Sequence, residues 1–201
     1  MGCGGKHVIA EPLVDWMAGK AGNVYTQFGE DGLIAAALDR IGTTNRQCFE
    51  IGAADGLFFS NTLRLRDAGW KSVLIESDLN QYRKLVRDYG KSSVCMYRNV
   101  TNLDDTLAES GIVWNPDFGS IDIDGQDWWM WLDMVEFRPR VILVEHSAVN
   151  PSDAIPVRGG PGQAGEYAIR QLGLDKGYTA VARTYCNVLF IETEELAKCE
   201  H

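Results

Sequence analysis

The sequence is short of basic side chains, with 19 lysines and arginines against 28 aspartates and glutamates and a net charge of −9. Proteins that bind nucleic acid neutralise its phosphates with a surplus of basic residues, so we expect no nucleic-acid partner. The sequence also contains no apolar run near the roughly 18 residues that a membrane span requires. We therefore expect no membrane partner.

Cysteine is too sparse and too irregularly spaced to define a structural framework. The five cysteines are odd in number, and no two of them have Cys-x-x-Cys spacing. Neither a disulfide network nor a cysteine zinc site is therefore predicted. The N-terminal stretch MGCGGKHVIAEPLVDW also lacks the apolar core of a signal peptide. Both absences favour a reduced, cytoplasmic environment.

What is present is an ordinary globular composition, with 45% hydrophobic and 23% charged residues. Short apolar runs, which predict strands, alternate with amphipathic stretches, which predict helices. This alternation is typical of α/β proteins, whose helices cover the faces of a mostly parallel sheet. We expect one domain over residues 1–201, because a domain has roughly 100–200 residues.

The alternation can be followed along the whole chain. Strands are predicted at residues 47–51, 71–76, 92–100, 118–123, 140–146, 179–185 and 187–193. Helices are predicted at residues 29–41, 60–68, 78–90, 102–110, 126–136 and 164–175. The last two strands have only Cys186 between them, so they must pair as an antiparallel hairpin.

Two segments stand outside this alternation. Residues 1–24 are predicted to form an N-terminal extension. Residues 147–165 contain a run rich in glycine and proline, which breaks regular secondary structure. The second segment is long enough to be a substrate loop.

The strongest motif is FEIGAADG at residues 49–56, a predicted strand that runs into a turn of small residues. Gly52, Ala53 and Gly56 let a ligand approach the backbone closely, and free amides there suit a nucleotide-like cofactor. Glu76 ends the next strand, where a carboxylate can hold both hydroxyls of a ribose. A dinucleotide-binding turn would have G-x-G-x-x-G spacing, whereas this turn contains Asp55, which suits a cationic sulfonium or amino group.

These residues resemble the first motif of class I S-adenosylmethionine-dependent methyltransferases, whose fold also ends in an antiparallel hairpin. More narrowly, the chain resembles the FkbM-type methyltransferases. The segments that carry this resemblance are YTQFGEDGLI (25–34), FEIGAADGLFFSNT (49–62), GWKSVLIE (69–76), SIDIDGQDWWMW (120–131) and NVLFIE (187–192). The resemblance implies a Rossmann-like three-layer sandwich with a seven-stranded, mostly parallel sheet, in which the last strand lies between the fifth and the sixth.

The resemblance also implies an activity and a set of cofactor contacts. The expected reaction is methyl transfer from S-adenosyl-L-methionine to an oxygen of a small molecule or sugar. The residues assigned to the cofactor are Gln27, Asp31, Glu50, Gly52, Ala53, Gly56, Glu76, Asn99 and Asp122. Among them, Glu76 would hold the ribose, and the region around Asn99 would flank the adenine.

Acidic residues and one histidine follow two neighbouring predicted strands, with Asp127 close by in sequence. Asp122 and Asp124 share one face because side chains alternate along a strand, and Glu145 and His146 end the next strand. Ligands of open α/β sheets bind at the carboxyl ends of strands, so these groups are expected to converge. Together they could hold Mg²⁺, which prefers oxygen ligands and would lower the pKa of an acceptor hydroxyl.

Without a metal, Asp124 would cap the next helix, and His146 would be a polar wall or a general base with a pKa near neutrality. The predicted catalytic residues are therefore His146, Asp124 and Glu145. Two other classes of protein stay open, namely a different Rossmann-like enzyme and a non-catalytic cofactor-binding protein. The enzyme would be an NAD-dependent oxidoreductase or a phosphatase, since DIDG at 122–125 is similar to a phosphatase motif. The residues indicate no oligomeric state.

Overall fold

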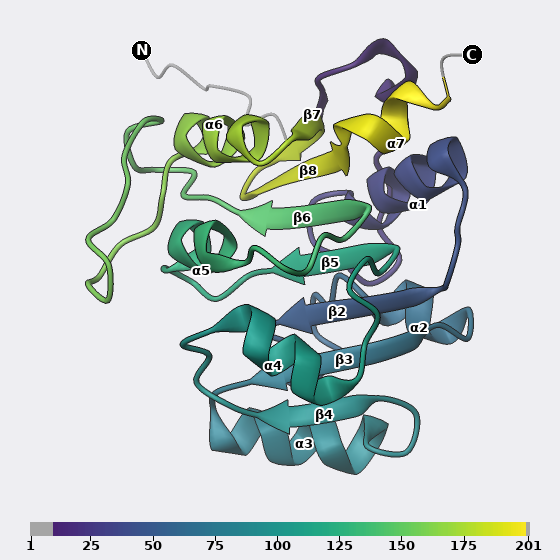
Figure 1. Ribbon diagram of the computed structural model, residues 1–201, viewed down its shortest axis with the longest axis vertical. Coiled ribbons are helices and arrows are strands. Elements are labelled where there is room, and N and C mark those ends of the chain that lie inside the picture. Colours follow the sequence, from purple (N-terminus) through teal and green to yellow (C-terminus); the bar gives the residue numbers. More distant parts are fainter. Residues whose placement is uncertain (1–9, 200–201) are drawn as a thin grey trace, which may run out of the picture.

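One mixed sheet of eight strands runs through the protein in a computed structural model, which describes residues 10–199 (Figure 1). The strands are β1 (Ala10–Pro12), β2 (Gln47–Ile51), β3 (Lys71–Glu76), β4 (Val94–Tyr97), β5 (Phe118–Ile121), β6 (Val141–Glu145), β7 (Tyr178–Thr184) and β8 (Asn187–Glu192). Their order in the sheet is β1-β7-β8-β6-β5-β2-β3-β4. Strands β2 to β6 are parallel to one another, so their carboxyl ends meet at one edge.

Helices cover both faces of the sheet. They are the 3-10 helix η1 (Asp15–Met17) and the α-helices α1 (Glu30–Ile41), α2 (Leu63–Asp67), α3 (Leu79–Tyr89), α4 (Leu103–Ser110), α5 (Asp127–Asp133), α6 (Glu166–Asp175) and α7 (Thr193–Ala197). Successive side chains of β2 separate the two layers, because Cys48 packs against α1 and Phe49 packs in the cluster that includes α4, α5 and α6. The predicted α/β three-layer sandwich is confirmed.

The end of the sheet also agrees with the sequence. Strand β8 lies between β6 and β7 and is antiparallel to both, which confirms the predicted closing hairpin. The predicted number of seven strands is wrong by one, because Ala10 pairs with Thr184 and β1 adds an antiparallel edge strand. Three residues are too few to show a strand pattern, so only the pairing with β7 makes this segment a strand. Residues 1–9 of the predicted N-terminal extension lie outside the described residues.

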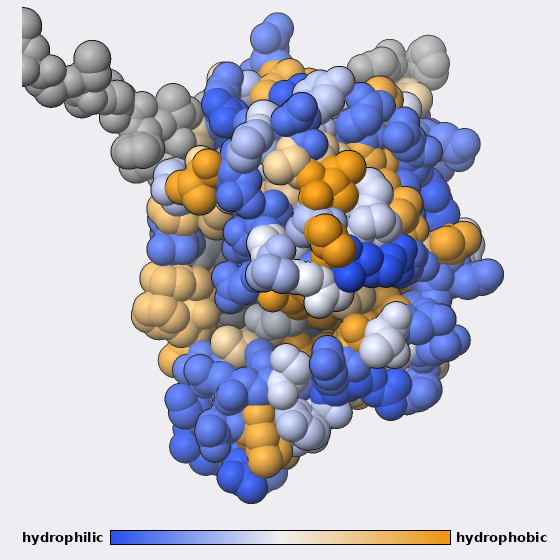
Figure 2. All heavy atoms as spheres, turned by 90° about the vertical axis from the view of Figure 1, so that its left-hand side faces the viewer, coloured by the Kyte–Doolittle hydropathy of each residue, from blue (hydrophilic) through white to orange (hydrophobic). Residues whose placement is uncertain are grey.

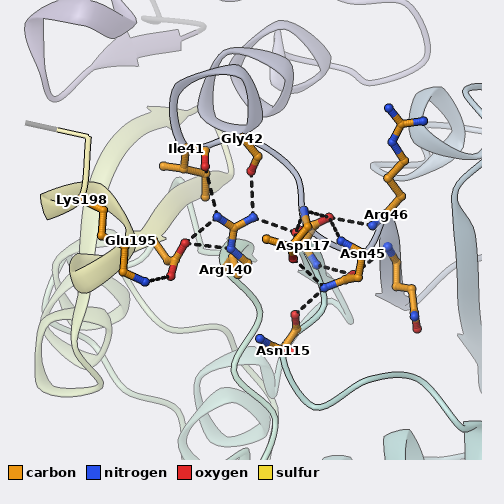
Figure 3. Close-up of polar contacts among 11 residues, drawn as sticks. Ile41, Gly42, Asn45, Arg46, Asn115, Asp117, Arg140, Glu195 and Lys198 are labelled. Atoms are coloured by element: carbon orange, nitrogen blue, oxygen red, sulfur yellow. Dashed lines mark hydrogen bonds and ion pairs between the residues drawn. The ribbon is translucent and has the colours of Figure 1, made fainter.

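A buried ion pair joins elements at the amino ends of the parallel strands (Figure 3). Asp117 accepts a hydrogen bond from Arg140 at 2.8 Å and further bonds from the backbone N–H groups of residues 44–46. Arg140 also donates to the carbonyl oxygens of Ile41 and Gly42 at the end of α1. These contacts connect the α1–β2 turn to the start of β5 and β6, at the edge opposite the carboxyl ends. Within residues 10–199, no helix is long and apolar enough to cross a membrane.

Candidate cofactor-binding and active site

A cavity of about 690 Å³ opens at the edge where the parallel strands end. Its walls come from the turn after β2, the end of β3, residues 98–101 after β4, residues 122–126 after β5, one side of α5, and residues 158–162. Figure 2 looks onto this edge and shows a hollow near the middle of the surface. The cavity thus brings Gly52, Glu76, Asn99 and Asp122, four of the residues assigned to the cofactor, to one place.

Close packing within the protein explains why the motif has glycine at positions 52 and 56. Gly52 has a φ of +81°, and a Cβ atom there would lie 1.8 Å from the carbonyl oxygen of Asp122. A Cβ atom at Gly56 would lie 2.5 Å from Leu85 Cδ1 of helix α3, on a side away from the cavity. Of the described residues, Gly52 and Ala54 line the cavity whereas Ala53 and Gly56 do not. The glycines therefore allow close packing of backbone and helix, and only Gly52 also forms the wall.

Glu76 connects the end of β3 to the glycine turn. Its Oε2 atom accepts the Ala54 N–H at 2.7 Å, and its Oε1 atom accepts the Asp78 N–H at 2.6 Å. Asp78 in turn caps α3 by accepting from two backbone N–H groups of its first turn. The Glu76 carboxylate is thereby held rigidly in the cavity wall, and each oxygen keeps a lone pair for a further donor. Asp55, which was expected to face the cofactor, accepts from Leu57 and Phe58 N–H and lies outside the wall.

Carboxyl groups gather at the ends of β5 and β6. Glu145 Oε2 accepts the Asp124 N–H at 3.0 Å and the Gln163 side-chain N–H at 2.6 Å. Asp127, at the first position of α5, accepts the N–H groups of residues 123 and 125 and fixes that turn. Asp122 and Asp124 line the cavity, with Asp124 in a left-handed conformation at a φ of +57°. The side chains of Asp122 and Glu145 are also hydrogen-bonded to each other.

Burial and crowding of these carboxyl groups raise their pKa values. Burial, followed by the charges of Asp127 and Asp124, raises the pKa of Asp122 to about 7. Burial and the charge of Asp122 raise the pKa of Glu145 to about 10. Burial also raises the pKa of Asp127 to about 6, against the lowering effect of its backbone donors. Burial and mutual repulsion therefore favour a proton shared between Asp122 and Glu145, so that the pair carries less charge than two free carboxylates.

His146 does not join this group. It follows Glu145, which is the last residue of β6, and its Nε2 atom is buried without a hydrogen-bond partner among the residues that the structure describes. Its Nδ1 atom lies 3.2 Å from the Ser147 carbonyl oxygen, and burial lowers its pKa. The described residues that line the cavity do not include it.

The predicted magnesium site consisted of Asp122, Asp124, Glu145 and His146. Of these four residues, only Asp122 and Asp124 line the cavity. Moreover, among residues 10–199 no group of three or more histidine, cysteine and acidic side chains is arranged to hold a metal ion.

Three other residues assigned to the cofactor lie outside the cavity wall, and two of them hold loops in place. Glu50 is buried and accepts the Ser60 hydroxyl at 2.7 Å and the Asn61 N–H at 2.7 Å. Because these residues bind Glu50, they do not cap a helix, and α2 begins at Leu63 rather than at residue 60. Asp31 accepts the N–H groups of residues 24–26, and Gln27 is exposed.

Sequence reasoning missed several residues of the cavity and its surroundings. Gln126, Trp129 and Asp133 on and before α5 line the cavity together with Arg158. The tryptophans were a visible signal, but a tryptophan on a helix is more often part of the core. Only the contact between α5 and residues 158–162, which are distant in sequence, places these side chains at a site.

The α/β Rossmann-like fold is shared with methyltransferases of known structure. The chain is similar to a crystal structure of a putative O-methyltransferase from Klebsiella pneumoniae, with a TM-score of 0.59, 15% identity, and coverage of 86% of this chain and 83% of that chain. It is also similar to magnesium protoporphyrin IX methyltransferase from Synechocystis PCC 6803 with bound S-adenosylmethionine, with a TM-score of 0.51, 14% identity, and coverage of 80% and 76%.

A third similar structure is the N-terminal domain of EvdMO1 with S-adenosylhomocysteine bound, with a TM-score of 0.52, 12% identity, and coverage of 83% of this chain and 82% of that domain. Neither a scan against protein-family models nor a search of curated proteins finds a match to the sequence. Identities this low define the fold, whereas the activity has to be argued from the site.

Proposed function

We propose that this protein transfers a methyl group from S-adenosylmethionine to an oxygen atom of a small molecule or sugar, as in the FkbM-type enzymes that its motifs resemble. The observation that carries the proposal is the buried Glu76 carboxylate in the wall of a cavity of about 690 Å³ at the carboxyl edge of the sheet. That is where open α/β sheets bind their ligands.

The residues present fit this cofactor chemically. The free lone pairs of Glu76 would accept the two ribose hydroxyls, and apolar side chains of the wall such as Val100, Leu103 and Met130 would contact the adenine. Asp122 lies at the end of β5, where its carboxyl group would balance the positive charge of the cofactor. When bound, the cofactor supplies an electrophilic methyl group, and the task of the protein is to hold the acceptor in line with it.

The carboxyl groups at the ends of β5 and β6 are the proposed acceptor site. Asp124 is exposed toward the cavity and would accept a hydrogen bond from the acceptor hydroxyl. Glu145 holds the Asp124 backbone in place through the 3.0 Å hydrogen bond to its N–H. A similar structure, the EvdMO1 domain in the presence of S-adenosylhomocysteine and D-fucose, supports a sugar as one class of acceptor.

Calorimetric titration of the purified protein with S-adenosylmethionine, S-adenosylhomocysteine and NAD⁺ tests the proposal. We expect both sulfur ligands to bind and NAD⁺ not to bind. Glu76→Ala should weaken binding by about 1.5–3 kcal/mol, the usual range for charge-assisted hydrogen bonds, and Glu76→Gln by less. Glu136→Ala is the matched control, because Glu136 is exposed and lies outside the wall. Tight NAD⁺ binding, or undiminished affinity in a folded Glu76→Ala variant, would contradict the proposal.

A further inference from the structure

The segment of residues 156–162, here called the strap, is held at both of its ends by the body of the protein. It belongs to the loop between β6 and α6, which extends beyond the strand ends in Figure 1. The Ser147 N–H donates to Ala164 O at 2.8 Å, and the Gly165 N–H donates to Ala154 O at 2.8 Å. These bonds join the two ends of the loop to each other. They do not involve the strap, which contacts α5 instead.

Gln126, immediately before α5, holds the backbone of the strap. Its side-chain oxygen accepts the Gly159 N–H at 2.7 Å, and its side-chain nitrogen donates to the Gly160 carbonyl at 2.8 Å. Trp129 adds a hydrogen bond from its indole N–H to the Pro156 carbonyl at 2.8 Å. The strap is therefore fastened to α5 by a few side chains and not by packing of an apolar core.

Arg158 is the one charged residue of the strap, and its side chain contacts α5. Its guanidinium lies 4.3 Å from the centre of the Trp129 ring and forms two hydrogen bonds to Asp133, one of them 3.0 Å long. The side chains of Arg158 and Asp133 are 54% and 37% exposed, so water competes for both groups. Such an exposed pair is easily broken.

The strap forms part of the cavity wall. Residues 158–162 line the cavity together with Trp129, Met130 and Asp133, and residues 98–101 form another part of the same wall. Gly159 and Gly162 have φ values of +71° and +103°, a region that favours glycine, so the course of the strap depends on these two residues. A ligand of the size of a nucleoside would contact the other walls of the cavity, and the strap would cover it from one side.

We infer that the strap is a lid over the cofactor and that Arg158 is its latch, which opens to exchange S-adenosylhomocysteine for S-adenosylmethionine. The inference rests on the proposed function for the identity of the ligand. It differs from the expectation that this loop binds the acceptor, because it assigns to the loop the exchange of the cofactor. Breaking the latch should speed entry and exit of the ligand together, whereas losing a simple binding contact would speed exit only.

Stopped-flow measurement of S-adenosylhomocysteine binding and release tests the latch. We expect Arg158→Ala and Asp133→Asn each to raise both rate constants by about three- to tenfold, as loss of an exposed ion pair and a cation–π contact allows. The exchanged pair Arg158→Asp with Asp133→Arg should restore slower exchange. Arg170→Ala, which removes an exposed ion pair of α6 outside the cavity wall, should change neither rate. Faster release with unchanged association, or no change at all, would overturn the inference.

A readout without ligand separates this inference from the proposed function. The Gly159 N–H is hydrogen-bonded only while the strap lies on Gln126, so its hydrogen exchange reports opening. We expect Arg158→Ala to raise the exchange rate of this amide several-fold and Arg170→Ala to leave it unchanged. If S-adenosylhomocysteine does not bind the wild-type protein, the proposed function fails. An unchanged Gly159 exchange rate in Arg158→Ala would instead contradict the latch.

Discussion

Gly52 lies so close to the carbonyl oxygen of Asp122 that no other residue fits between the ends of β2 and β5. A Cβ atom at Gly52 would be 1.8 Å from that oxygen, and the φ of +81° is a conformation that side chains rarely adopt. The glycine turn therefore supports the fold before it serves any ligand. Close approach of a ligand, which the sequence predicts, is thus a second reason for a glycine at this position and not the first.

Gly52→Ala should lower the free energy of unfolding by about 2–4 kcal/mol, the sum of a left-handed backbone penalty and an overpacking penalty. Gly69→Ala is the matched control, because Gly69 has a φ of +82° and a Cβ atom there would have no neighbour within 4 Å. The control should lose only about 1–2 kcal/mol. Urea denaturation of the two variants measures the difference, and equal losses would show that the backbone contact is unimportant.

Asp117 and Arg140 form the most buried ion pair in the part of the chain described, with side-chain exposures of 0% and 6%. Burial raises the pKa of Asp117, but the Arg140 guanidinium and the backbone N–H donors outweigh it and hold the pKa below its ordinary value. Asp117→Asn should cost about 3–5 kcal/mol at pH 7, because it leaves a buried guanidinium with weaker compensation. Denaturation midpoints at pH 7 measure this loss, and Asp88→Asn, in an exposed pair, should leave the midpoint unchanged.

The lowered pKa of Asp117 also makes the free energy of unfolding depend on pH. Because the folded state holds this proton less tightly than the unfolded state, the stabilisation is complete above about pH 4 and is lost as the pH falls below it. Asp117→Asn should therefore flatten the stability curve in acid. An equally steep acid loss in the variant would mean that other carboxylates dominate this transition.

Glu145 should make stability change with pH in the opposite direction. Its pKa is raised to about 10, so the folded state keeps a proton that the unfolded state has released, and stability falls as the pH rises from about 5 toward 10. The slope from one such group is at most about 1.4 kcal/mol per pH unit. Glu145→Gln replaces the protonated acid by an amide that can still accept from Asp124 and donate to Asp122. We expect this variant to be more stable than the wild type at alkaline pH.

Denaturation midpoints at about pH 6, 7, 8 and 9 measure the slope for Glu145→Gln and for the exposed control Glu136→Gln. The control should follow the wild type. A wild-type curve that does not fall over this range would show that Glu145 is ionised in the folded protein, which would contradict the shared proton between Glu145 and Asp122.

Asp31 is expected to position the segment that precedes α1. Its Oδ2 atom accepts the N–H groups of Val24, Tyr25 and Thr26 at 2.8, 2.7 and 2.9 Å. Asp31→Ala should lower stability by about 1.5–3 kcal/mol and speed hydrogen exchange of these three amides. Cofactor affinity measured by calorimetry should change far less than in Glu76→Ala. A loss as large as that of Glu76→Ala would favour the cofactor contact that the sequence resemblance implies for Asp31.

The order of strands and helices could be predicted from the sequence because hydrophobic periodicity is a local property. The closing hairpin was equally determined, since so short a connection, Tyr185 and Cys186 in the structure, cannot make the long crossover that parallel pairing needs. The glycine turn and Glu76 were both recognised, and the structure joins them directly through the Ala54 N–H. Their roles toward a cofactor are still predictions.

Only the tertiary structure decided which residues meet at the cavity. Strand β1 forms because Ala10 pairs with Thr184, which is far along the chain. His146 follows the last residue of β6 and does not line the cavity. Arg158 reaches α5 because its loop folds back over the strand ends. Contacts of this kind arise from packing between distant segments and leave no periodic pattern in the sequence, whereas strands, helices and turns are specified by neighbours along the chain.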